Sequence, residues 1–132
     1  MSLIQHNEMS SKFGTAINCM DGRIQIPINQ WLKTNYDIDN VDTITEHGIV
    51  KLFSNSEEIV KIKSKVSLSI EQSNSKIIVV SAHHDCEGNQ ISKDDQVLQI
   101  KNAVSIIRSW GLTSTIIGIW VNEQLQVEVI EK

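Results

Sequence analysis

The sequence is short of the residues and segments that mark several special classes of protein. One proline and six glycines among 132 residues exclude collagen-like and proline-rich disordered chains. No apolar stretch approaches the roughly 20 residues needed to cross a bilayer, and the N-terminus lacks the charged and then apolar build of a secretory signal peptide. We therefore expect a cytoplasmic protein that does not bind membranes.

Basic residues are not in excess either. The 12 lysines and arginines are outnumbered by 16 aspartates and glutamates, which gives a net charge of -4 and predicts no nucleic-acid partner. The 40% of hydrophobic residues and 21% of charged residues are typical of a soluble globular protein. A chain of this length can bury one core, so we expect a single domain over residues 1–132. Residues 1–12 show no clear period, and an irregular arm and a disordered segment are the alternatives for them.

Strand and helix patterns alternate along the rest of the chain. Buried or alternating apolar runs predict strands, and apolar residues at helical spacing predict helices. Helices are expected to begin at Pro27, at a Ser56 cap and at a Ser92 cap. The expected strands are Phe13 to Cys19, Val41 to Ile44, Lys76 to Ala82, Thr115 to Val121 and Leu125 to Val129.

This alternation predicts an α/β fold with three layers, α/β/α, around a mostly parallel sheet. We expect the core strand order 2-1-3-4, with the last strand added as an antiparallel edge because its residues alternate strictly between apolar and polar. In this order, the chains that follow strands 1 and 3 leave in opposite directions. A crevice therefore opens at the carboxyl ends of these two strands.

Cysteine is scarce, and both copies follow predicted buried strands. Cys19 opens the segment Cys-Met-Asp-Gly-Arg at residues 19–23, and Cys86 closes the segment His-His-Asp-Cys at residues 83–86. Neighbouring strands lie about 4.8 Å apart, so soft ligands at the ends of strands 1 and 3 can hold one ion. The two segments therefore predict a single zinc site that uses every cysteine of the chain.

These segments resemble the zinc signature of the β-class carbonic anhydrases, with Cys-x-Asp-x-Arg after the first strand and His-x-x-Cys after the third. The resemblance extends over most of the chain, because the strand and helix order from Phe13 to Val121 and the position of Asp42 are similar to that family's core. Residues 42–48, 84–89 and 120–121 resemble a compact carbonic-anhydrase-like branch of these enzymes.

The resemblance implies that Cys19, His83 and Cys86 are zinc ligands and that Asp21 and Arg23 form the family's catalytic Asp-Arg dyad. It implies reversible hydration of carbon dioxide to bicarbonate by zinc-bound hydroxide, with Zn2+ as the only cofactor. In the family, the aspartate orients the zinc-bound water or closes the fourth zinc position itself. A homodimer or higher homo-oligomer is also expected, because the family builds its sites at subunit boundaries and the last strand has an open edge.

The sequence departs from the family near both motifs. Glu46-His47-Gly48 stands in place of the family's Arg-Asn-Ala-Gly segment, and Ala82 and Glu87 stand where the family has glycines. The family's substrate pocket therefore does not transfer to this chain. Carbonyl sulfide and carbon disulfide are alternative substrates for the same zinc hydroxide, and a non-catalytic zinc-binding or bicarbonate-binding domain is the second alternative.

Each candidate residue also has a purely structural interpretation. The two cysteines could be buried apolar side chains or a redox pair, and Asp21 with Arg23 could be an ordinary surface ion pair. Structural roles are preferred for the other histidines, the tryptophans and one aspartate pair, namely His47, His84, Trp31, Trp110, Trp120, Asp94 and Asp95.

Overall fold

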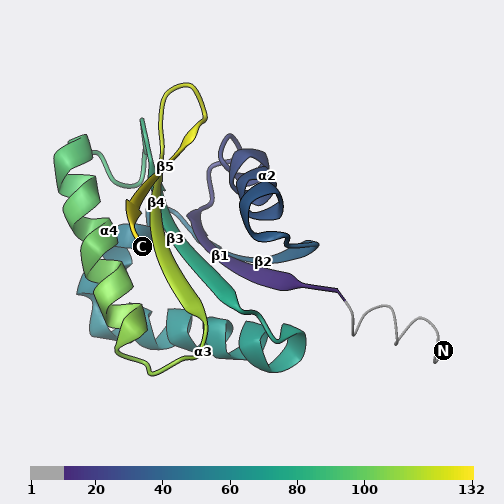
Figure 1. Ribbon diagram of the computed structural model, residues 1–132. Helices are drawn as coiled ribbons and strands as arrows, with labels where there is room; N and C mark the ends of the chain where they lie inside the picture. Colours follow the sequence, from purple (N-terminus) through teal and green to yellow (C-terminus); the bar gives the residue numbers. More distant parts are fainter. Residues whose placement is uncertain (1–10) are drawn as a thin grey trace.

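A five-stranded sheet forms the centre of the computed structural model, which describes residues 11–132 (Figure 1). The strand order is β2-β1-β3-β4-β5, in which β1 to β4 are parallel to one another and β5 is antiparallel to β4. This arrangement confirms the predicted topology. The arm or disordered segment expected at residues 1–12 lies outside the described residues, except for its last two. The strands are β1 (Phe13–Cys19), β2 (Asn40–Glu46), β3 (Ile77–His83), β4 (Thr115–Val121) and β5 (Val127–Glu131).

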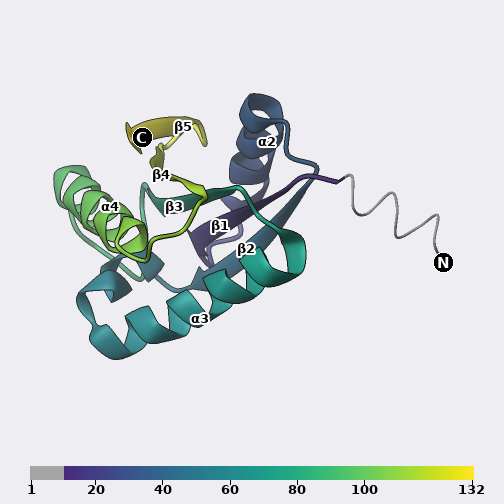
Figure 2. The same ribbon diagram turned by 60° about the horizontal axis from the view of Figure 1, so that its bottom comes forward.

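Helices cover both faces of the sheet and complete the three layers (Figure 2). Helix α2 (Gln25–Tyr36) packs on one face, whereas α3 (Ser56–Ser73) and α4 (Lys93–Arg108) pack on the other with the short 3-10 helix η1 (Ile49–Ser54). None of the helices in the described part of the chain is long and apolar enough to span a membrane.

The continuous apolar sequence of β3 divides between two cores. All of β3 is buried, as expected for a central parallel strand with helices on both faces. Ile78 and Val80 pack in the core beneath α3 and α4, and Ile77 and Val79 pack in the core beneath α2. Since side chains alternate along a strand, Ser81 follows Ile77 and Val79 toward the α2 side.

Two helix starts differ from the sequence-based expectations. Helix α2 begins at Gln25 instead of Pro27, which is its third residue. Proline is tolerated there because a backbone N–H in the first turn has no partner within the helix. Helix α3 is capped by Asn55 instead of Ser56, because the Asn55 side chain accepts a hydrogen bond from the Glu58 N–H. The predicted Ser92 cap of α4 is confirmed.

The last strand also begins later than expected. β5 covers Val127–Glu131, not Leu125 to Val129, because residues 122–126 form the turn from β4. Leu125 has a φ of 60°, which no strand residue adopts, and the Asn122 side chain accepts hydrogen bonds from two backbone N–H groups of the turn. β2 is three residues longer than predicted, and β3 is shifted by one residue toward His83.

Asp42 anchors α3 to the sheet. Its carboxylate accepts hydrogen bonds from the hydroxyl groups of Ser69 and Ser73 at 2.7 and 2.8 Å. Both serines lie near the end of α3, so the bonds hold this helix against β2. The position of Asp42, which supported the family resemblance, therefore has a structural explanation.

Candidate metal centre

Three ligand-type side chains converge where β1 and β3 end. Cys19 is the last residue of β1, His83 is the last residue of β3, and Cys86 lies in the loop that follows. Their ligand atoms all lie within 4.8 Å of one another, and the two sulfur atoms are 3.8 Å apart. All three residues are buried. The parallel pairing of β1 with β3 therefore brings together residues that are more than sixty positions apart in the chain.

The His83 ring is oriented as a metal ligand would be. Its Nδ1 lies 2.8 Å from the carbonyl oxygen of His84. Because a carbonyl oxygen only accepts hydrogen bonds, Nδ1 is the donor, and in the neutral ring Nε2 keeps its lone pair. This Nε2 is buried and has no hydrogen-bond partner among the described residues. An unpaired buried nitrogen is costly unless something else, such as a cation, binds it.

The two thiols and the free imidazole nitrogen fit a zinc ion. Two sulfur atoms and one nitrogen form a common set of three protein ligands, which leaves a fourth tetrahedral position for water or substrate. Burial, helped by the neighbouring Cys19 thiol, raises the pKa of the Cys86 thiol to about 11. A bound cation would replace the thiol protons and stabilise thiolates in this buried position.

The turn after β2 closes one side of the centre. Gly48 has a φ of 62°, and its N–H donates a hydrogen bond to Cys19 Sγ at 3.3 Å. A side-chain carbon on Gly48 would lie 2.4 Å from the carbonyl oxygen of Gly88, in the loop that carries Cys86. Glycine is therefore required where the two loops meet. The Glu46-His47-Gly48 segment, which differs from the family, thus contributes a backbone donor to the cysteine sulfur.

Asp21 and Arg23 form a tight ion pair in the loop after β1. Arg23 Nη2 lies 2.7 Å from Asp21 Oδ2, Arg23 Nε lies 3.1 Å from Oδ1, and the Arg23 backbone N–H donates to the same carboxylate at 2.9 Å. The hydrogen bonds from Arg23 are the main reason that the pKa of Asp21 falls to about 2. The predicted pair is therefore formed, and its carboxylate is ionised at neutral pH.

Arg23 has a second partner that the sequence interpretation missed. Its guanidinium donates to the backbone oxygen of Asp85 at 3.1 Å and lies 3.5 Å from the Asp85 carboxylate. Asp85 sits between His83 and Cys86 with a φ of 57°. Arg23 therefore joins the loop of Asp21 to the loop of Cys86. The sequence offered one signal for this contact, which is the position of Asp85 inside the second motif. Aspartate also tolerates a positive φ better than most residues, which suits this position.

His47, His84 and the three tryptophans of the described residues do not join the ligand group. His47 and His84 are exposed. The His84 and Trp120 rings form a T-shaped contact, and both line, with Lys93, a hollow of about 240 Å³. Trp120 is buried and donates to the Gln96 side chain at 2.7 Å. Trp31 and Trp110 pack against the two cores, and Asp94 and Asp95 lie in the first turn of α4, as expected.

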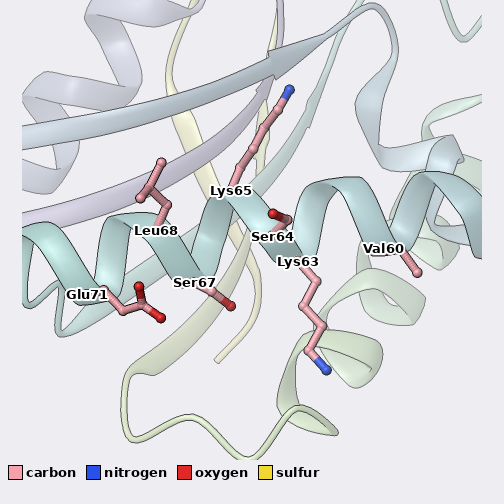
Figure 3. A pocket seen from close by; sticks show the side chains of 7 residues that line it. All are labelled: Val60, Lys63, Ser64, Lys65, Ser67, Leu68 and Glu71. Atoms are coloured by element: carbon pink, nitrogen blue, oxygen red, sulfur yellow. The ribbon is translucent and has the colours of Figure 1, made fainter.

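A larger hollow of about 520 Å³ lies along the outer side of α3 (Figure 3). Two apolar side chains there, Val60 and Leu68, are more than half exposed. The hollow shares no residue with the metal group. Its lining residues are Val60, Lys63, Ser64, Lys65, Ser67, Leu68 and Glu71.

Comparison with known proteins agrees with this geometry. A family model described as "Putative carbonic anhydrase" matches residues 9–131. The chain belongs to this family. A search of curated proteins found no match. Within this carbonic anhydrase family, the Cys-His-Cys group is the part of the structure that could hold the metal on which such chemistry depends.

The ligand assignment can be tested by metal analysis. The parent protein should bind about one zinc per chain, and Cys19→Ser and Cys86→Ser should each lose most of it, because a serine hydroxyl does not ionise to replace a thiolate. His83→Ala should lose zinc as well. His84→Ala is the matched control and should keep the metal, since its ring points to Trp120. Loss of zinc from His84→Ala with retention in His83→Ala would contradict the assignment.

Proposed function

We propose that the protein is a zinc enzyme that reversibly hydrates carbon dioxide to bicarbonate. The observation that carries the proposal is the buried Cys19, His83 and Cys86 group, whose histidine keeps one ring nitrogen without a partner among the described residues. Membership of a carbonic anhydrase family supports it. A zinc ion held there supplies a Lewis acid that lowers the pKa of coordinated water, so that hydroxide is available near neutral pH.

In this proposal Asp21 orients the attacking group and Arg23 holds Asp21. Because the pKa of Asp21 is about 2, its carboxylate accepts hydrogen bonds at neutral pH and does not donate them. The planar guanidinium of Arg23 contacts both carboxylate oxygens, which restricts rotation of the side chain. The same contact keeps the carboxylate from turning toward the fourth metal position. A carboxylate bound there would exclude water.

Carbon dioxide is preferred over larger substrates because the three ligand residues are at most 6% exposed. A site so closed suits a small linear molecule. Carbonyl sulfide and carbon disulfide have the same shape and remain the competing substrates. A zinc-binding or bicarbonate-binding role without turnover is the competing function.

Stopped-flow mixing with carbon dioxide and a pH indicator tests the proposal directly. The zinc-loaded protein should accelerate hydration well above the buffer, and the chelated, metal-free protein should not. Parallel assays of sulfide release from carbonyl sulfide and carbon disulfide identify the preferred substrate. Zinc-loaded protein at one ion per chain that gives only the buffer rate would refute the carbonic anhydrase activity.

The dyad can be tested by two substitutions that leave the three ligands in place. Asp21→Asn should lower turnover by about 10- to 1000-fold, because the amide no longer offers an anionic acceptor. Arg23→Ala should also lower turnover, since the freed carboxylate can then occupy the open metal position. Zinc content should be unchanged in both.

Asp94→Asn makes the same chemical change as Asp21→Asn in the first turn of α4 and serves as the control, with turnover equal to that of the parent. Parent-like turnover in both dyad variants would mean that Asp21 and Arg23 form only a surface ion pair.

We also propose that the chain forms a homodimer or a higher homo-oligomer. β5 is the outermost strand on its side of the sheet, and Val129 on it is 47% exposed. An open strand edge with exposed apolar side chains is a common site of self-association. Light scattering at micromolar concentration should give a mass of at least two chains, and a monomer mass would contradict this proposal.

A further inference from the structure

The Gln25 side chain forms hydrogen bonds with the backbone of the loop that carries Asp21. Gln25 is the first residue of α2, and its side-chain Nε2 lies 2.8 Å from the carbonyl oxygen of Cys19 and 2.8 Å from that of Asp21. An amide nitrogen has two hydrogens, so it satisfies both carbonyl groups at once. One side chain therefore holds the loop at two points, one at a candidate ligand and one at the dyad aspartate.

A buried chain of polar groups sets the direction of this amide. The Ser81 hydroxyl donates to Asn18 Oδ1 at 2.8 Å, and Asn18 Nδ2 donates to Gln25 Oε1 at 3.0 Å. Asn18 is fully buried and Ser81 is 1% exposed, so water cannot replace the contact between them, whereas the Asn18–Gln25 contact is part-buried. The opposite orientation of the Gln25 amide would place its oxygen against two carbonyl oxygens, which is repulsive. Donors and acceptors therefore match at every contact from Ser81 through Asn18 to Gln25.

The polar chain connects the two strands that supply the metal group. Ser81 lies two residues before His83 on β3, and Asn18 directly precedes Cys19 on β1. Gln25 extends the connection to the loop between β1 and α2. The positions of the histidine, the first cysteine and the dyad loop are therefore linked through side chains in addition to the backbone pairing of the strands.

The loop is held mainly by the contacts of Arg23 with Asp21 and Asp85 and by the Gln25 side chain. Gly22 lies between the dyad residues, and a side-chain carbon on it would meet nothing within 4 Å. Glycine also has the greatest backbone freedom of any residue. Two backbone hydrogen bonds of this loop are longer than the 2.8 Å bonds of Gln25. The Met20 nitrogen lies 3.3 Å from the Glu46 carbonyl oxygen, and the Ile24 nitrogen lies 3.4 Å from the Asp21 carbonyl oxygen.

We propose that Gln25 is a positioning residue for the metal centre and the dyad, with Asn18 and Ser81 as its supports. The proposal rests on the proposed zinc function. Arg23 fixes the carboxylate of Asp21 and ties its loop to the loop of Asp85, whereas Gln25 fixes the loop of Asp21 relative to β1 and β3. Without Gln25, the ion pair would persist, but its place relative to the ligands would vary. A shift of about 1 Å in such a group can lower a reaction rate about 100-fold.

The test compares Gln25→Met with Gln30→Met. Methionine keeps the length of the side chain and removes its amide, and Gln30 is an exposed residue of the same helix. Both variants should bind about one zinc or one cobalt(II) per chain. Gln25→Met should lower kcat/KM for carbon dioxide about 10- to 100-fold. It should also change the visible spectrum of the cobalt(II) form and the pH dependence of that spectrum, while Gln30→Met matches the parent in every measurement.

The spectrum separates positioning from a merely structural role. A Gln25→Met protein with a lower Tm but with parent-like kcat/KM and cobalt(II) spectrum would overturn the proposal. If Gln25→Met does not fold, Gln25→Glu replaces it, because glutamate still accepts from Asn18 but cannot donate to the two carbonyl groups. The same loss of activity and spectral change are expected, and a parent-like result again overturns the proposal.

Failure of the proposed function would be visible separately. If the zinc-loaded parent does not hydrate carbon dioxide, the proposed carbonic anhydrase activity is refuted. The cobalt(II) spectra still show whether Gln25 positions the centre. A spectral change in Gln25→Met but not in Gln30→Met supports positioning in that case. Equal spectra in the parent and both variants refute it.

Discussion

The parallel pairing of β1 with β3 is the interaction on which the candidate centre depends. The register that places Ala16 beside Val79 and Ile17 beside Val80 also ends both strands at the same edge. Buried apolar residues on both faces hold this register, since a slip by one residue would reverse the face of every side chain. The hydrophobic cores therefore set the distance between Cys19 and His83, and Cys19 and Cys86 themselves belong to the core beneath α2.

Buried polar groups around the centre are paired, with one informative exception. Asn18, Ser81 and the Cys19 sulfur all have hydrogen-bond partners despite their burial. The exception among the described ligand residues is His83 Nε2. An unpaired buried nitrogen destabilises a fold, and in this position, beside two thiols, it belongs to a group that could hold a metal ion.

Charge is organised around Arg23. Its guanidinium holds Asp21 through both oxygens and reaches Asp85 in the other loop. The Asp21–Arg23 pair is partly exposed, so it contributes little to the free energy of unfolding. Its main effect is to fix the orientation of the Asp21 carboxylate. Gln25 complements it by holding the backbone of the same loop. One contact orients the carboxylate, and the other orients the segment that carries it.

The strands, the two candidate metal motifs and the ion pair of Asp21 and Arg23 could be predicted from the sequence, because apolar period and short spacings are local properties. The strand order followed from the alternation of strands and helices and from the rules for parallel sheets. Helix starts and the last turn were placed less well, since Asn55 competed with Ser56 as a cap and Leu125 adopts a turn conformation that its residue type does not favour. The contacts of Gln25, Asp85 and the Gly48 N–H around the candidate centre could be seen only in the folded chain. Their contacts join separate loops, and the distances between loops follow from sheet register and helix packing, which no local pattern records.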